Sequence, residues 1–299
     1  MALDGLFLST VKDEIESIAL NSRIDKIYEP SKEEIILVLR FKGGKAKLLL
    51  SASANSPRVH FTEMSPENPK SPPMFCMLMR KYLSTAKLIG VRQQGLDRIL
   101  FLDFETVNEL GDLTTITVVC EIMGRHSNII LVDSNSKIID SIKRISEDMS
   151  SVRIVLPGVK YELPPAQQKL NPFTTDRDTM LSAFKNGKNT DFAKAILNVY
   201  EGVSPILARE LAHRATGGLE LMKNEVSDYR FRCLFDLIDS VKEDILRGKV
   251  TFCTVLDNGK PRDFTLTDIT QYGKLLSKKT YSAPSALLDE FYLERDRIE

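Results

Sequence analysis

The first half of the chain alternates short apolar runs with turn residues. Leu6, Val11 and Ile15 recur near helical spacing and predict a helix over 3–19. Strands are predicted at 24–29, 34–41, 45–52 and 58–63 and, after a helix at 74–86, at 98–105, 114–123, 127–133 and 137–145. Because few helices separate these short strands, the pattern favours an antiparallel β-sandwich with flanking helices over a parallel α/β fold.

The second half is mainly helical. Helices are predicted at 191–200, 205–216 and 229–247. Ser204 is suited to cap the second of these, with Pro205 in its first turn, so the first two form a helix-hairpin-helix unit. A β-hairpin over 251–269 turns at Asn258-Gly259, and because two isolated strands are marginally stable we expect it to pack against other elements.

The proline-rich segment 156–173 divides the chain. We expect an α+β protein with a sandwich domain over 1–172 and a helix-hairpin-helix domain with its β-hairpin over 173–285. Residues 286–299 have a helical pattern without a stop signal, and we expect them to begin a coiled coil that continues further.

Composition and charge narrow the partners. Lys plus Arg equals Asp plus Glu at 41 each, so an anionic partner must be bound by a local patch. The four cysteines lie far apart in apolar surroundings, which predicts neither a zinc site nor a disulfide framework. The amino terminus lacks the pattern of a signal peptide and no run is long enough to span a membrane, so we expect a cytoplasmic protein without a membrane partner.

The usual catalytic motifs are absent from the sequence. It contains no phosphate-binding loop, no dinucleotide fingerprint and no nucleophile elbow, and its three histidines are widely separated. We therefore expect no catalytic residue, no metal, no cofactor and no small-molecule substrate.

Local charge is the most informative feature. Residues 76–100 contain one acid, Asp97, against the basic residues Arg80, Lys81, Lys87, Arg92 and Arg98. The turn that follows the strand at 114–123 joins Glu121 to Arg125, His126 and Asn128, which offer donors for phosphates or base edges. An ordinary hairpin loop with a solvated ion pair is the competing interpretation, because most surface ion pairs have little effect.

Two further residues could support RNA contacts. Ser204 lies at the start of a helix, where free backbone N–H groups can hold a phosphate, and Arg209 follows one turn later. A compact helical corner without a ligand explains the same pattern.

Several motifs in order resemble one family. They are MALDGLFL, PPMFCMLMRKYL, GLDRIL, CEIMGRHSNIILVD, GVKYELPP and GVSPILARELAHRA, and together they are similar to the NFACT family of ribosome quality control factors. The resemblance implies an NFACT-N domain, similar to the amino-terminal domain of formamidopyrimidine-DNA glycosylases, and then a helix-hairpin-helix domain. Those glycosylases require a proline amine directly after the initiator Met. Ala2 stands here, so that nucleophile is missing.

The resemblance also implies partners. Family members bind the large ribosomal subunit that carries a stalled peptidyl-tRNA and recruit charged tRNA for untemplated carboxyl-terminal tailing. In bacterial members the tail is alanine, which implies tRNA-Ala. The ribosome makes the peptide bond, so the protein is not expected to be an enzyme. An adhesin that binds fibronectin, as an older family name suggests, is the alternative.

The family's Asp-Arg pair, associated with tRNA binding, falls on Asp97 and Arg98. Neighbours on a strand point to opposite faces, so both can reach one ligand only from the turn before the strand. We therefore expect both side chains to be exposed near residues 124–128, and their replacement to cost at most about 0.5 kcal/mol of stability.

Overall fold

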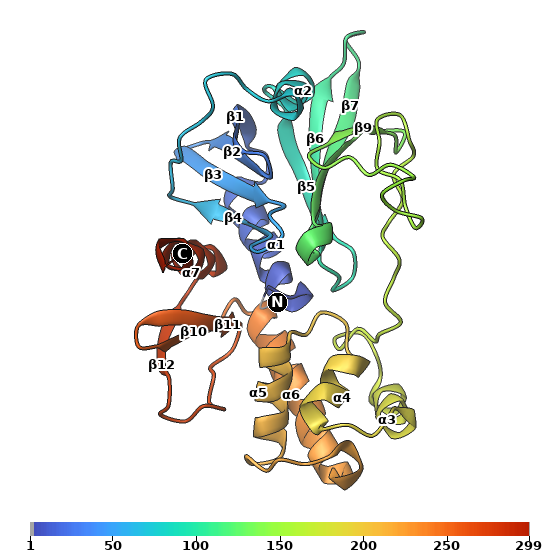
Figure 1. The fold of residues 1–299 in the computed structure, drawn as a ribbon, viewed down its shortest axis with the longest axis vertical. Coiled ribbons are helices and arrows are strands. Elements are labelled where there is room, and N and C mark those ends of the chain that lie inside the picture. Colours follow the sequence, from blue (N-terminus) through green and yellow to red (C-terminus); the bar gives the residue numbers. More distant parts are fainter. Residues whose placement is uncertain (1–2, 299) are drawn as a thin grey trace. The chain divides into compact units, whose positions relative to one another are not determined.

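Within residues 3–298, which the computed structural model describes, nine antiparallel strands form one sheet in the order β4-β3-β2-β1-β5-β6-β7-β8-β9 (Figure 1). The strands are β1 (Arg23–Ser31), β2 (Glu34–Phe41), β3 (Gly44–Ser51), β4 (Arg58–Thr62), β5 (Lys87–Gln93), β6 (Ile99–Val107), β7 (Leu113–Glu121), β8 (Asn128–Val132) and β9 (Ile138–Ser141). β1 joins β5 through the register pair Arg23↔Lys87, so the sheet has two halves, β1–β4 and β5–β9.

The two halves contact each other, which confirms the predicted antiparallel sandwich. β3 lies against β8, and Lys143 Nζ donates to the carbonyl oxygen of Ala52 at 2.6 Å. Helix α2 (Met74–Leu83) packs on β1, β6 and β9. The sheet is therefore folded back on itself and closed partly by a helix.

The outer face of the second half is buried as well. Ile99 and Phe101 of β6 lie in an apolar cluster that includes Val155 and is covered by Tyr161, so the segment after β9 packs over this face. Alternation along the strand directs Leu100 to the opposite face, and it is fully buried too. Both faces of β6 are consequently apolar over Ile99–Leu102, before Asp103.

The remaining elements form a second unit. It contains α3 (Arg177–Asn186), α4 (Phe192–Val199), α5 (Pro205–Ala215), α6 (Asp228–Leu246) and α7 (Pro284–Ile298), with a sheet of β10 (Phe252–Asp257), β11 (Lys260–Thr265) and β12 (Ser277–Tyr281). Phe184 lies at the centre of its helices, with ring contacts to Phe192, Tyr200 and Phe231. We call this part the helical unit and the first the sheet unit.

The two units are not separated at one point near residue 172, as the sequence predicted, because each is built from more than one segment of the chain. The helical unit comprises the chain up to Thr10, Gly95–Asp97 and residues from Gln167 onward, whereas the sheet unit comprises Val11–Gln94 and Arg98–Ala166. Helix α1 (Gly5–Ala19) thus contributes to both. A Cβ at Gly5 would lie 1.6 Å from the carbonyl oxygen of Leu96, so only glycine allows this approach.

The β-hairpin is packed as expected. Asn258 and Gly259 take positive φ values of 50° and 80°, as its turn requires. Phe264 is fully buried, with its ring 5.0 Å from Phe7 and 4.8 Å from Phe291. The hairpin therefore belongs to the core of the helical unit.

A buried carboxyl lies under α2. Glu29 is 5% exposed, accepts a hydrogen bond from the Cys76 backbone N–H and leaves Oε1 without a partner among the described residues. Burial raises the pKa of Glu29 to about 6 from an ordinary 4.5. The ionised form is therefore disfavoured in the folded protein, and stability is lost as the pH rises from 4.5 through 6.

Glu29→Gln should increase the free energy of unfolding by up to about 2 kcal/mol above pH 6 and change it little below pH 4.5. Urea unfolding at pH 4.5 and pH 7.5 measures the difference, with Glu109→Gln, at an 89% exposed side chain, as the control. Equal effects at both pH values would contradict the buried charge.

Candidate nucleic-acid interface

One end of the sheet unit brings several predicted residues together. β6 begins there at Ile99, opposite Glu121 at the end of β7, and Ile122 N donates to the carbonyl oxygen of Arg98 at 2.9 Å. A 3-10 turn, η1 (Gly124–His126), then leads to Asn128 at the start of β8. Arg98 and the turn thus share one edge of the sheet.

The expectation that Asp97 and Arg98 are exposed is wrong. Both side chains are only partly accessible, and neither is without an interaction partner. The bend before them is anchored, because Leu96 is buried and its backbone N donates to Glu201 Oε1 at 2.6 Å.

Glu121 lies inside the protein and is held there. Its carboxylate accepts from Arg153 Nη2 at 2.6 Å, Arg153 Nη1 at 2.7 Å and Tyr161 Oη at 2.7 Å, and the residue is fully buried. Burial acts to lower the pKa of Arg153, but the hydrogen bonds and charge of Glu121 raise it overall. Glu121 therefore forms a structural ion pair with Arg153, and its carboxylate presents no atom to a ligand.

Asn128 also turns inward. It is 1% exposed, its amide donates to the Lys143 carbonyl at 2.9 Å, and its Oδ1 accepts from Lys143 N at 3.1 Å. By contrast, Arg125 and His126 are exposed on η1, with Arg125 Nε 3.3 Å from His126 Nε2. Ser127 Oγ accepts from Met123 N at 2.8 Å and fixes the turn. Arg125 and His126 are thus the predicted donors of this turn that reach solvent.

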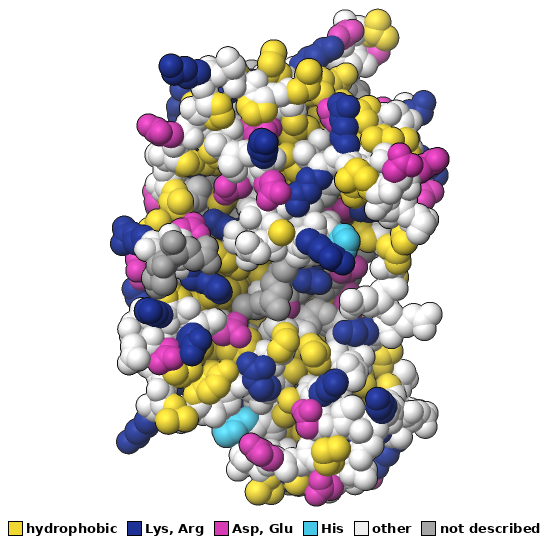
Figure 2. Space-filling model, in the orientation of Figure 1, with side chains coloured by type: hydrophobic (Ala, Val, Ile, Leu, Met, Phe, Trp, Pro, Cys, Tyr) yellow, Lys and Arg dark blue, Asp and Glu magenta, His cyan; other side chains and the backbone are white. Residues whose placement is uncertain are grey.

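The basic stretch 76–100 does not form one patch. Arg80 donates to the Ile27 carbonyl at 2.7 Å, and Lys81 Nζ lies 3.9 Å from Glu109 beyond the far end of β6. Arg92 binds Asp103 at 2.7 Å and lies over the Phe101 ring. Lys87 is paired in the ladder with Glu105. The two ends of β6, one next to Arg98 and the other near Glu109 and Lys81, are about 25 Å apart. Figure 2 shows Lys and Arg dispersed among acids over the visible face.

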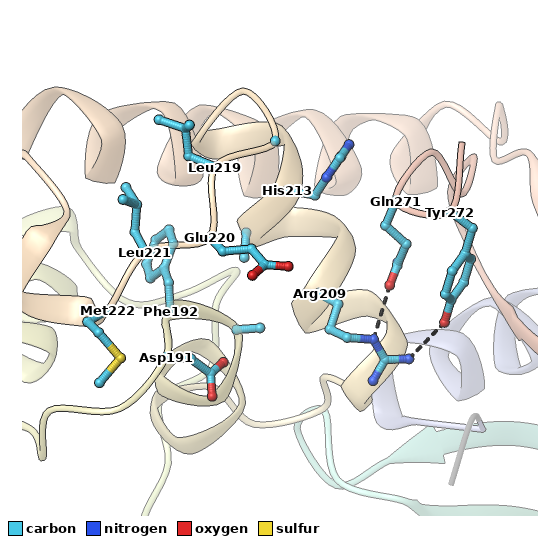
Figure 3. Close-up of a pocket in the computed structure, with 13 residues that line it drawn as sticks. Asp191, Phe192, Arg209, His213, Leu219, Glu220, Leu221, Met222, Gln271 and Tyr272 are labelled. Atoms are coloured by element: carbon cyan, nitrogen blue, oxygen red, sulfur yellow. Dashed lines mark hydrogen bonds between the residues drawn. The ribbon is translucent and has the colours of Figure 1, made fainter. Parts of the chain in front are cut away.

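The predicted phosphate site at the start of α5 is already filled by the chain. Ser204 is 2% exposed, and its backbone N donates to Asp4 Oδ2 at 2.9 Å. Asp4 Oδ1 accepts from Phe7 N at 2.7 Å and so also caps α1. The anion that a helix amino terminus favours is therefore an internal carboxylate. Arg209, further along α5, is exposed and lines a hollow (Figure 3).

Sequence reasoning missed Arg153 as a structural residue. It lies in a segment without helical or strand periodicity, so no pattern identified it. Its partner Tyr161 stands in the GVKYELPP motif, which was a usable signal. Among the described residues, no helix is long and apolar enough to cross a bilayer, and no cluster of acidic, histidine or cysteine side chains suits a metal.

Comparison with known proteins gives consistent matches. A family model described as NFACT N-terminal and middle domains matches residues 4–299. The Bacillus subtilis (strain 168) protein named Rqc2 homolog RqcH is 40% identical over 305 residues, which cover 100% of this chain and 50% of the relative. The human ribosome quality control complex subunit NEMF is 29% identical over 42% of this chain and 11% of its own length.

A solved structure matches almost end to end. The fibrinogen binding protein from Staphylococcus aureus superimposes with a TM-score of 0.79 at 31% identity, covering 98% of this chain and 99% of that one. This chain spans about half the length of the Bacillus relative.

Proposed function

The chain belongs to the family of NFACT N-terminal and middle domains, and from that premise we propose that it is the amino-terminal part of a ribosome-associated quality control factor. In this proposal it binds tRNA and the large ribosomal subunit obstructed by peptidyl-tRNA. It recruits charged tRNA, alanyl-tRNA in particular, so that the stalled chain gains an untemplated carboxyl-terminal tail. The ribosome supplies the catalysis, and the protein supplies binding in the cytoplasm.

The observation that carries the proposal is the full-length similarity to a protein named as an Rqc2 homolog, at 40% identity. The sheet edge supports it chemically. Arg125 and His126 offer exposed donors on a fixed turn, and Arg98 is joined to that edge through its main chain. Guanidinium and imidazole donors at a fixed spacing suit phosphates and unstacked bases of RNA.

Salt dependence tests whether Arg125 contacts a phosphate. Each neutralised phosphate contributes about 0.7–0.9 to the slope of log affinity against log salt. We expect the protein to bind tRNA more tightly than duplex DNA of equal length, and Arg125→Ala to reduce the tRNA slope by about one. Filter binding from low to moderate salt measures both.

Arg40→Ala is the matched control. Arg40 is exposed on β2, where it pairs in register with Arg23, so it lies at the Lys87 end of the ladder rather than the Arg98 end. Its replacement should leave the slope unchanged. Equal losses in the two variants would indicate non-specific attraction, and equal affinity for tRNA and duplex DNA would contradict recognition of tRNA.

Binding to a host matrix protein is the second candidate. It is favoured by the match to the solved Staphylococcus aureus protein, which is described as a fibrinogen binding protein. Immobilised fibronectin and fibrinogen, with albumin as the control surface, separate the two functions. We expect no saturable binding above albumin. Saturable binding that Arg125→Ala leaves intact would favour the adhesin.

A further inference from the structure

A hollow of about 730 Å³ opens in the helical unit between α4, α5 and the loops at 217–222 and 271–272 (Figure 3). Arg209 and His213 of α5 line one side, together with Gln271 and Tyr272. Leu219, Leu221 and Met222 line the other side, as Figure 3 shows. The volume falls in the range of about 300–1,000 Å³ in which proteins bind small ligands.

The guanidinium of Arg209 is fixed by neutral groups. Its Nε donates to Gln271 Oε1 at 3.0 Å and its Nη2 to Tyr272 Oη at 3.2 Å. Gln271 is itself anchored, since its backbone N donates to Glu210 Oε1 at 3.0 Å and its side chain to the Ile206 carbonyl at 3.1 Å. Glu210 is fully buried and its charge is paired with Arg214 at 2.8 Å. Arg209 is therefore held in place by neutral hydrogen-bond partners. Burial raises the pKa of the Asp263 carboxyl overall, and the charge of Arg209 acts to lower it.

Two other exposed arginines of the same unit are paired with acids. Arg177 and Arg262 lie 2.6–2.9 Å from carboxylates, whereas no carboxylate within the described part of the chain lies within 4.0 Å of Arg209. A positioned guanidinium that is not hydrogen-bonded to a carboxylate is suited to an oxyanion, because its side chain is already ordered. His213 lies one helical turn further on and can supply a second donor.

The rest of the hollow limits what the oxyanion belongs to. Leu219 and Met222 are 58% and 39% exposed and offer an apolar surface for a flat group. Asp191 and Glu220 also line the hollow, and Figure 3 places the Glu220 carboxylate between the apolar side and Arg209. These acids would repel a second phosphate, but they can accept hydrogen bonds from exocyclic amines of a base.

We propose that this hollow binds one phosphate-bearing nucleotide, with the phosphate on Arg209, the base against Leu219 and Met222, and a base amine on Glu220. A nucleotide within single-stranded RNA and a free nucleoside monophosphate share this chemistry, and the RNA nucleotide is the source we favour. The site is separate from the sheet edge and is tested without tRNA, so its failure would leave the proposed function standing.

The test follows backbone amide signals by NMR during titration with adenosine 5′-monophosphate. We expect saturable shifts at 217–222 and 271–272. Adenosine, which has no phosphate, should bind the wild type at least about tenfold more weakly than AMP does, because a charge-assisted hydrogen bond is lost. AMP should bind Arg209→Gln more weakly by a similar factor for the same reason. Arg262→Gln, at an exposed and paired arginine of the same unit, should bind AMP as the wild type does. Uridine 5′-monophosphate, which lacks an exocyclic amine, should bind more weakly than AMP, and Glu220→Ala, which removes the acceptor, should abolish that preference.

A short single-stranded oligonucleotide distinguishes the two sources. Tighter binding than AMP at the same amides identifies RNA, and equal or weaker binding identifies the free nucleotide. Absence of saturable shifts with both ligands would overturn the proposal, as would equal AMP affinity in wild type and Arg209→Gln.

Discussion

Replacement of Arg153 with alanine is expected to lower the free energy of unfolding by about 3–5 kcal/mol. The variant leaves the carboxylate of Glu121 fully buried, with Tyr161 as its remaining side-chain donor. A buried charge that loses its partner bears the desolvation cost without the Coulombic gain. Tyr161→Phe removes one hydrogen bond and should cost about 1–3 kcal/mol, since Arg153 still neutralises the charge.

Urea unfolding of both variants measures these effects. Arg247→Ala is the control, because Arg247 and Glu243 form a pair whose side chains are 65% and 52% exposed, and such pairs contribute about 0–1 kcal/mol. If Arg153→Ala lowered the free energy of unfolding no more than Arg247→Ala does, the buried ion pair between Arg153 and Glu121 would not exist in solution. That outcome would return Glu121 to the set of possible RNA contacts.

Replacement of both Asp97 and Arg98 is expected to weaken tRNA binding by at least about a hundredfold, if each contributes a charge-assisted hydrogen bond worth about 1.5–3 kcal/mol. The partial burial of both side chains changes the expected stability cost. We expect the double alanine variant to lose about 1–2 kcal/mol, more than an exposed pair would.

A second double variant, Asp97→Asn with Arg98→Lys, separates binding from stability. It retains side-chain size but removes the carboxylate charge and the planar guanidinium fork. It should unfold close to the wild type and still bind tRNA poorly. A variant that folds normally and binds tRNA fully would exclude the pair as the tRNA contact. Weak binding only in variants that melt far lower would make the pair a structural brace.

The strands with a clear apolar run between turn residues were predictable, and those without one were not. β2, β3 and β7 match the predicted ranges closely because each carries a continuous apolar run that is buried in the sheet and bounded by turn residues. β5 was missed because an irregularity between Leu88 and Gly90 shifts its register and interrupts the period of two. β12 has almost no buried side chain, so its backbone pairing with β10 leaves no sequence signal. α3 was missed because it buries only Met180 and Phe184.

The candidate site was predictable in location but not in exposure. Sequence spacing indicated correctly that Arg98 and the turn at Arg125 would meet at one sheet edge, because β6 and β7 pair in register there. It could not show that Glu121 and Asn128 face inward, since their partners Arg153 and Lys143 lie 32 and 15 residues away in the chain. Pairing between polar groups distant in the sequence decides which donors remain available to a ligand. Such pairs cannot be identified from the residue pattern of a single sequence.

The proposed function is that the protein that contains this chain recruits tRNA to an obstructed large ribosomal subunit. Its most direct test is affinity purification of the full-length protein from cells, followed by sequencing of the bound RNA, for wild type and the Asp97→Asn, Arg98→Lys variant. We predict enrichment of tRNA-Ala and large-subunit ribosomal RNA with the wild type, and loss of the tRNA alone in the variant. Recovery of neither RNA above an untagged control would contradict the proposed function.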